Sequence, residues 1–305
     1  MERPQQVNVD MVISERVNFG RVLCPIDLLP DSGEAIRYAA FFAKTCGAEL
    51  MICHCRGSAQ LADPDAEGSL LRLVSRAKLK GPSQRDRVLV MDGDPVVAIL
   101  QMAADKRVDL IVMRSRSAQH AGALLGSIAE AVCRTAPCPV LVTHPQNHEP
   151  GEATAETLLR RVLVAYDFSS DAELALAYGL HLARKNQAEL HLLHILPGRA
   201  RIGALVVPLS AVPGFREMES RLRGAASEMS GLTREIKHAV REGQPYREVL
   251  AYAEEQEIDL ICMGASGTGF GLHALFGSNV DRVLRSSRCP VIVARPLRPT
   301  MPLAC

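Results

Sequence analysis

The chain is organised around Asp259-Leu260-Ile261-Cys262-Met263, which runs directly into Gly264-Ala265-Ser266-Gly267. The first part is an apolar run headed by an acid, the pattern of a buried strand in a parallel sheet. After a spacer, Gly277-Ser278 opens a helical pattern that Cys289-Pro290 ends, and Val291-Ile292-Val293 is a final strand. The stretch therefore predicts a strand, a glycine loop, a helix and a strand, in that order.

The glycine loop is of a kind that binds phosphate. Gly264, Gly267 and Gly277 let the backbone approach a ligand without an intervening Cβ. We expect Ser278 to cap the following helix, with Asp281 completing a capping box, so that free amides and the helix dipole face an anion. Two other phosphate motifs are excluded, because the loop has no lysine for a Walker motif and has leucine where a dinucleotide motif needs glycine.

The composition is that of a globular protein. The chain has 305 residues, 48% hydrophobic and 23% charged, with a formal net charge of +1, and a chain of this length predicts about two domains. No apolar run is long enough to span a membrane, and residues 1–6 lack the apolar core of a signal peptide. With 4% aromatic residues, no tryptophan and no basic block, nucleic-acid binding is not expected. Nine cysteines, scattered through apolar runs, favour a reducing cytoplasm over a disulfide framework.

The chain contains two copies of one unit. Residues 21–27 (RVLCPID) and 161–167 (RVLVAYD) match at an offset of 140 residues, the difference between 161 and 21. Asp109 and Asp259 match at an offset of 150, so the second copy holds ten more residues before this point. Each copy alternates strands with helical patterns, which implies parallel strands joined by helical crossovers.

The expected elements follow this repeat. The predicted helices are 35–45, 95–104, 172–185 and 245–255, with further candidate helices at 69–78 and 225–236. The predicted strands begin at 21 and 161, at 48 and 188, at 109 and 259, and at 140 and 291. Residues 199–215 contain two prolines and suggest a loop or lid.

We therefore predict an α/β protein of two tandem doubly wound domains, each a five-stranded parallel sheet with helices on both faces. The expected segments are an N-terminal extension (1–19), a first domain (20–143), a linker (144–159), a second domain (160–297) and a C-terminal tail (298–305). Ligands in such sheets bind at the carboxyl ends of the strands, at a switch point of the strand order.

The spacing Gly-x2-Gly-x9-Gly-Ser at Gly264, Gly267, Gly277 and Ser278 closely resembles the ATP-binding signature of the universal stress protein family. With the internal duplication, the chain resembles a tandem universal stress protein from about residue 21 to residue 296. The resemblance implies a pocket at the ends of strands one, two and four. The residues it assigns to the nucleotide are Ala165, Asp167, Ile195, Met263, Gly264, Gly267, Gly277 and Ser278.

The resemblance assigns each residue a role. Asp167 would hydrogen-bond the nucleoside, Ala165 would line the base, Ile195 would offer its backbone to the adenine edge, and Met263 would pack on the ribose or base. The glycines and Ser278 would hold the phosphates. The alternative role for Asp167 is that of an acid in the N-cap region of the following helix. Ser169 and Ser170 compete with it for that role.

The implied function is that of an ATP-binding protein, with or without Mg²⁺, which acts as a nucleotide-dependent sensor or regulator in stress adaptation. Two alternatives stay open: a slow ATPase or nucleotidyl-transfer enzyme, and a carrier or scaffold for an apolar or metal ligand. No carboxylate stands beside the loop as a base, so we assign no catalytic residue and expect at most weak hydrolysis. His273 lies in the spacer and is read as a loop residue.

The first copy departs from the motif. Asp27 is retained and Met113 matches Met263, but Arg114 replaces the first glycine and Ser117 the second. The loop is also one residue shorter before Gly126-Ser127, where Ser127 is expected to cap a helix with Glu130. We expect a degenerate site, and hence one nucleotide per chain. As an alternative, Arg114 and Arg116 would bind a different anion.

Two further patterns bear on ligands and assembly. Cys53-His54-Cys55 invites a metal site, but successive residues of a strand point to opposite faces, so we read these residues as buried and predict no metal site. The fifth strands, ending at Val142 and Val293, would be apolar sheet edges, which are usually paired or covered. In the resembled family these strands pair between domains, which implies a pseudo-dimer within one chain. The sequence leaves homodimerisation and the regulatory partner open.

Overall fold

The computed structural model describes residues 17, 19–29, 32–57, 65–76, 88–115, 125–144, 159–198, 214–266 and 276–295. The chain divides into two compact units. The first unit comprises Asn18–Leu158 together with Leu284–Cys305, and the second comprises Met1–Val17 with Leu159–Val283. The closing residues of the second sequence copy therefore belong to the unit built by the first copy.

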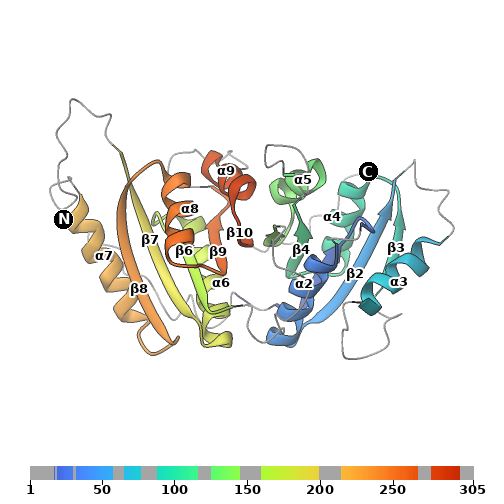
Figure 1. Cartoon of the computed structure of the whole chain (residues 1–305), viewed down its shortest axis with the longest axis horizontal. Coiled ribbons are helices and arrows are strands. Elements are labelled where there is room, and N and C mark those ends of the chain that lie inside the picture. The colour runs from blue at the N-terminus through green and yellow to red at the C-terminus, as the bar shows by residue number, and fades with distance from the viewer. Residues whose placement is uncertain are drawn as a thin grey trace. The chain divides into compact units, whose positions relative to one another are not determined.

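The first unit is a parallel sheet in the order β3-β2-β1-β4-β5, with helices in its crossovers (Figure 1). Its elements are β1 (Arg21–Pro25), α2 (Gly33–Cys46), β2 (Glu49–Arg56), α3 (Ala66–Arg76), β3 (Val88–Asp92), α4 (Pro95–Asp105), β4 (Leu110–Arg114), α5 (Ser127–Thr135) and β5 (Val140–Thr143). Helix α2 contacts α3, and α4 contacts α5. Right-handed crossovers place the first pair on one face and the second pair on the other, because the strand order reverses between β1 and β4.

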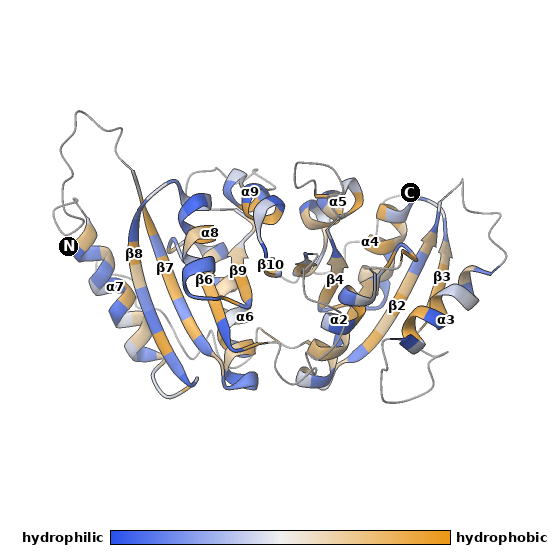
Figure 2. Cartoon of the chain, viewed as in Figure 1, coloured by the Kyte–Doolittle hydropathy of each residue, from blue (hydrophilic) through white to orange (hydrophobic). Residues whose placement is uncertain are grey.

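The second unit repeats this arrangement, with its described strands in the order β8-β7-β6-β9. Its elements are β6 (Arg161–Ala165), α6 (Ser170–Asn186), β7 (Glu189–Pro197), α7 (Phe215–Glu228), β8 (Glu235–Gly243), α8 (Pro245–Glu255), β9 (Leu260–Gly264) and α9 (Ser278–Ser286), the last ending in the first unit. Figure 2 shows β8 alternating between polar and apolar residues, as expected for a strand at the edge of a sheet.

In each unit, an aspartate that precedes the fourth strand (β4 or β9) accepts hydrogen bonds from amides at the start of the first strand (β1 or β6). Asp109 Oδ2 accepts hydrogen bonds from the amides of Gly20 and Arg21, both at 2.9 Å. Asp259 Oδ2 accepts the equivalent bonds from the amides of residues 160 and 161, at 2.7 and 2.8 Å. Burial raises the pKa of both carboxyl groups, against the lowering effect of these bonds. The repeated acid therefore aligns the first strand with the fourth.

The α/β doubly wound class is confirmed, and most helices begin and end within two residues of their predicted limits. The candidate helix at 225–236 is wrong, because the helix is Phe215–Glu228 and residues from Glu235 form β8. Strand β7 continues two residues past its expected end at Ile195. Most of the loop or lid expected at 199–215 lies outside the described residues.

Strand β10 (Val291–Ala294) pairs antiparallel with β5 in the first unit. Leu141 and Ile292 face each other at the centre of this pair, and both are fully buried. His144 Nε2 donates to the carbonyl of Leu284 at 2.6 Å, and Arg285 binds Glu130 at 2.9 Å. The fifth strands thus pair as the resemblance implied, whereas a pseudo-dimer of the two copies stays a prediction.

We expect the two copies to hold together after the chain is cut between them. Cleavage at a protease site engineered into residues 150–156 should leave fragments that co-elute in size-exclusion chromatography, because β10 of one fragment completes the sheet edge at β5 of the other. The same cut in an Ile292→Lys variant should give separable fragments. Independent elution of the unsubstituted fragments at micromolar concentration would contradict the prediction.

Candidate functional site

The carboxyl ends of β6, β7 and β9 form the candidate site. Ala165, the last residue of β6, lies in register with Leu193 on one side and with Met263 on the other. Met263 is buried, and Ala165 is half-buried. The order of the strands reverses between β6 and β9, and in doubly wound sheets this switch point is where a ligand is expected.

Asp167 follows β6 in a tight turn. Its Oδ1 accepts hydrogen bonds from the amide and the hydroxyl of Ser169, at 3.0 and 2.5 Å. Ser169 in turn caps α6 by accepting from the amide of Ala172 at 3.1 Å. Ser169 is therefore the N-cap of α6. Asp167 is not the cap, and it holds Ser169 in place through these two hydrogen bonds.

The residue after the acid is left-handed in both copies. Phe168 has φ of 63°, and Leu28, which follows Asp27, has φ of 61°. Neither is glycine, and such a conformation is strained for side chains of this size. Strain of this kind persists where the surrounding structure enforces it, often beside a functional site. In both copies the carboxylate before this residue accepts from a serine hydroxyl at the start of the helix, Ser169 for Asp167 and Ser32 for Asp27.

Gly264 is required by packing. A Cβ at this position would lie 2.7 Å from the backbone carbonyl carbon of Asp171 in α6. Asp171 also holds the loop that follows, because its Oδ2 accepts from the amide and the hydroxyl of Ser266 at 2.9 and 2.6 Å. The first glycine of the motif thus lets the end of β9 pack against α6, and this packing role is independent of any role in ligand binding.

Gly264→Ala is accordingly expected to destabilise the protein by about 1–3 kcal/mol, the usual cost of forcing extra volume into a packed site. Gly277→Ala is the matched control, because the nearest atom to its added Cβ is 3.5 Å away. Denaturant unfolding of both variants measures the difference. Equal stability of the two would show that α6 moves away from β9 at no cost.

The amino end of α9 lies against the end of β9. The amide of Gly277 donates to the carbonyl of Ala265 at 2.8 Å, and the carbonyl of Gly277 accepts the first intrahelical bond, from Asp281, at 3.1 Å. The amides of residues 278–280 precede that bond, so they form the free end of the helix. Ser278 is the first helical residue and is exposed. Within the described residues no group bonds these amides, so the second copy presents them beside the end of β9.

The serine caps predicted for these helices need correction. In the first copy Gly126 holds the N-cap position of α5, no side chain caps the helix, and Ser127 is its first helical residue. Helix α9 likewise begins at Ser278. Glu130, predicted to complete a capping box, instead binds Arg134 and Arg285. Glycine at the N-cap leaves the first amides uncovered by a side chain.

In each copy a buried histidine hydrogen-bonds the backbone carbonyl just after the first strand. This role was not assigned from the sequence. His194 Nδ1 donates to the carbonyl of Tyr166 at 2.8 Å, and His54 Nδ1 donates to that of Ile26 at 2.9 Å. A carbonyl only accepts, so Nδ1 carries the proton in both rings. Burial lowers the pKa of His194, which keeps it neutral at pH 7. The offset of 140 between the two histidines was the available signal.

An aromatic stack borders Asp167. The ring of Phe168 lies 4.7 Å from that of Tyr166 and 5.2 Å from that of His194, between ring centroids. Arg221 of α7 covers the Phe168 ring, with Cζ 3.8 Å from its centroid. The stack anchors the strained turn, and its members come from three separate elements.

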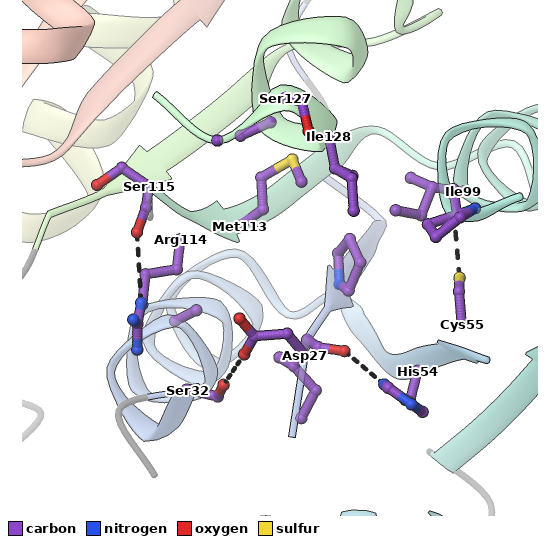
Figure 3. Close-up of a pocket in the computed structure, with 16 residues that line it drawn as sticks. Asp27, Ser32, His54, Cys55, Ile99, Met113, Arg114, Ser115, Ser127 and Ile128 are labelled. Atoms are coloured by element: carbon purple, nitrogen blue, oxygen red, sulfur yellow. Dashed lines mark hydrogen bonds between the residues drawn. The ribbon is translucent and has the colours of Figure 1, made fainter. Parts of the chain in front are cut away.

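The first copy differs at the equivalent place. Arg114 ends β4, and its Nε donates to the carbonyl of Ser115 at 3.3 Å (Figure 3). A cavity lies here, between the ends of β1, β2 and β4 and the start of α5. Arg116 and Ser117 lie outside the described residues. Within the described ranges no three His, Cys, Asp or Glu side chains gather as a metal site, and His54 is turned to Ile26.

The structure brings the predicted site residues of the second copy to one edge of the sheet. Ala165 ends β6 and Asp167 follows in the turn, Ile195 lies near the end of β7, and Met263 and Gly264 end β9. Gly277 and Ser278 stand at the start of α9. Gly267 and His273 lie outside the described residues. No helix in the described part of the chain has the length and apolar character of a membrane span.

Comparison with known proteins agrees with this architecture. The model of the universal stress protein family matches residues 18–144 and again residues 159–295. Universal stress protein Rv2623 of Mycobacterium tuberculosis is 28% identical over 238 residues, which are 74% of this chain and 73% of that protein. A universal stress protein of Thermus aquaticus is 34% identical over 134 residues, 41% of this chain and 98% of that protein. The crystal structure of a universal stress protein from Archaeoglobus fulgidus matches with a TM-score of 0.65 and 25% identity, over 92% of this chain and 99% of that one.

Proposed function

Since the chain belongs to the universal stress protein family and so has a role in the stress response, we propose that its second copy binds ATP. Nucleotide binding there would set the state of the protein as a sensor or regulator. The observation that carries the proposal is the meeting of two features at one edge: the diverging ends of β6 and β9, and the uncapped amides that open α9. Helix amides that open toward a switch point of the sheet favour a phosphorylated ligand.

The phosphates would lie at the amides of residues 278–280. The amide of Gly277 is already bonded to Ala265, so Gly277 contributes by leaving space beside these amides. Gly264 and Gly267 would let the loop backbone pass close to the same phosphates. Mg²⁺ would accompany the nucleotide mainly through phosphate oxygens, as it does in most nucleotide sites.

The nucleoside would lie against β6 and β7. The carbonyl of Leu193 accepts from the amide of Tyr166, so the backbone of Leu193 points toward β6. Two residues on, the backbone of Ile195 points the same way, past the end of β6 at Ala165. Its amide and carbonyl are therefore placed to bind the edge of a base, while Asp167 accepts hydroxyl groups of the sugar and Met263 packs beneath.

Thermal denaturation with added nucleotide tests the proposal. A ligand that binds the folded state raises the melting temperature with concentration, so ATP should do so, and inorganic triphosphate or adenosine alone should do so less. An unchanged melting temperature at millimolar ATP would contradict the proposal. A single-turnover assay with labelled ATP then separates a binding protein from a slow ATPase.

The protein is further proposed to act in the cytoplasm. The described cysteines are not joined to one another by disulfides, and most of them are buried. Thiols of this kind suit a reducing compartment.

A further inference from the structure

In the second unit a cluster of two arginines and a tyrosine joins the start of α8 to α9. Arg282 Cζ lies 4.8 Å from the centroid of the Tyr246 ring, and Arg247 Nε donates to the Tyr246 hydroxyl at 2.9 Å. Tyr246 is the second residue of α8, and Arg282 is the fifth residue of α9. We call these three residues the Tyr246 cluster.

The cluster lies at the edge of the sheet where the nucleotide is proposed to bind. Tyr246 comes three residues after Gly243, the last residue of β8, so it lies at the carboxyl ends of the strands. Arg282 comes four residues after Ser278, so the two share one face of α9. Because the side chains of a helix lean toward its amino end, Arg282 is directed toward the free amides that open α9.

Within the described residues no acid neutralises the arginines of the cluster. Arg247 and Arg282 are exposed, and neither forms an ion pair with Asp or Glu there. By contrast, Arg223 of the same unit pairs with Glu219 at 3.3 Å. The two arginines are held by the ring and hydroxyl of one tyrosine, so their charge stays available to an anion.

The positions that match the cluster in the first copy are apolar. At the offset of 150 residues for α8 and of 151 for α9, the matching residues are Val96, Val97 and Ala131. Asp281, the acid in the first turn of α9, has a counterpart in Glu130 of α5, so it does not distinguish the copies. The cluster therefore belongs to the copy that keeps the glycine motif.

The N-cap residues of the matching helices α4 and α8 differ in the same direction. Asp94 caps α4 by accepting from the amide of Val97 at 3.0 Å, and it adds a negative charge there. Gln244 is the N-cap of α8 and makes no side-chain cap hydrogen bond. Glu248, the acid in the first turn of α8, lies 3.8 Å from Arg241. The start of α8 is thus more favourable to an anion than the start of α4.

The three phosphate groups of ATP carry more negative charge than the start of α9 can balance. A helix end offers a few free amides and about half an elementary charge. The loop from Gly264 to Gly277 contains no lysine or arginine, so it supplies no cationic side chain. Arg282 is directed toward the same amides and can supply this charge, because its planar fork of N–H donors suits phosphate oxygens.

We propose that the Tyr246 cluster makes the site selective for ATP over AMP, with Arg282 binding the phosphates beyond the first. Tyr246 positions the Arg282 guanidinium, and Arg247 holds the tyrosine hydroxyl. The inference rests on the proposal that the second copy binds ATP, and it names the residues that distinguish the length of the phosphate chain.

Equilibrium titration of the full-length protein with ATP and with AMP, both in the presence of Mg²⁺, tests the inference. Arg282→Ala introduces the residue of the first copy at an exposed helical position, so the variant should fold. Its affinity for ATP should fall by at least about ten-fold, while its affinity for AMP stays unchanged. Arg223→Ala, which removes an exposed arginine of α7 and changes the net charge equally, should alter neither affinity.

Two substitutions of Tyr246 test its positioning role. Tyr246→Phe keeps an aromatic ring beside Arg282 and should retain the preference for ATP over AMP. Tyr246→Val introduces the residue of the first copy and removes the ring, so it should reduce the preference, though by less than Arg282→Ala does. A purely structural role of the tyrosine would lower the affinities for both nucleotides by the same factor.

The possible failures of this inference and of the ATP proposal can be told apart. An unchanged ratio of ATP to AMP affinity in Arg282→Ala would overturn the selectivity assigned to Arg282 and leave ATP binding by the second copy intact. Equal loss of both affinities in that variant would also overturn it, because the arginine would then support the whole site. A parent protein that binds neither nucleotide would overturn both proposals.

Discussion

Gly277→Val is expected to remove ATP binding while the protein stays folded. An added Cβ at this position would meet the carbonyl oxygen of Ala265 at 3.5 Å, an ordinary contact, so the backbone need not move. The branched side chain would, however, cover the amides that open α9 and exclude phosphate from them. Each lost charge-assisted hydrogen bond costs roughly 1.5–3 kcal/mol. Loss of two such bonds would lower the affinity by at least about 100-fold.

Equilibrium titration with ATP measures this loss, and the duplication provides its control. Gly126→Val makes the same change at the start of α5 in the first copy, where φ of −59° also accepts a side chain. We expect it to leave the ATP affinity unchanged. A Gly277→Val protein that binds ATP as tightly as the parent would refute the assignment of the phosphates to α9. Gly264 is unsuitable for this test, because its substitution disturbs packing against Asp171.

Asp167→Asn is expected to lower the affinity for ATP by about ten-fold or more, because a hydrogen bond to a charged acceptor contributes roughly 1.5–3 kcal/mol. The asparagine oxygen still accepts from the amide and hydroxyl of Ser169, so the cap of α6 should survive. The negative charge offered to the sugar hydroxyls is lost. The loss should be seen with ATP and with adenosine alike, since both contain the sugar.

Asp27→Asn is the matched variant in the first copy. Asp27 makes the corresponding bonds to Leu29 and Ser32, so any effect of the substitution on the turn should be similar in both copies. Its ATP affinity should equal that of the parent. If both substitutions weakened ATP binding equally, the acid would act through the stability of the chain, and the sugar contact would be wrong.

The layout of the fold could be predicted from sequence because its signals are local. Apolar runs mark the central strands, and the two offsets of the duplication pair them between copies. The edge strand β8 is not predicted from the sequence, because its polar and apolar residues alternate and most of them are only half-buried. Edge strands lack the continuous apolar run that identifies a strand buried on both faces.

The candidate site was predicted in position but only partly in its contacts. The motif located the ends of β6 and β9. The hydrogen bonds from Ser266 to Asp171, in contrast, join residues 95 positions apart, so no local sequence pattern indicates them. The role of Gly264 in helix packing likewise depends on how closely α6 approaches β9. The cap predicted at Ser127 failed because glycine at the preceding position holds the N-cap conformation without a side-chain bond. Such contacts arise only once the sheet is assembled.

The central claim is that one nucleotide binds per chain, in the second copy, and calorimetric titration of the full-length protein with ATP tests it most directly. We predict a stoichiometry near one, abolished by Gly277→Val and unaffected by Gly126→Val. In the first copy Arg114 occupies the place of Gly264 and lines the cavity there. A stoichiometry of two, reduced to one by either valine substitution, would contradict the account.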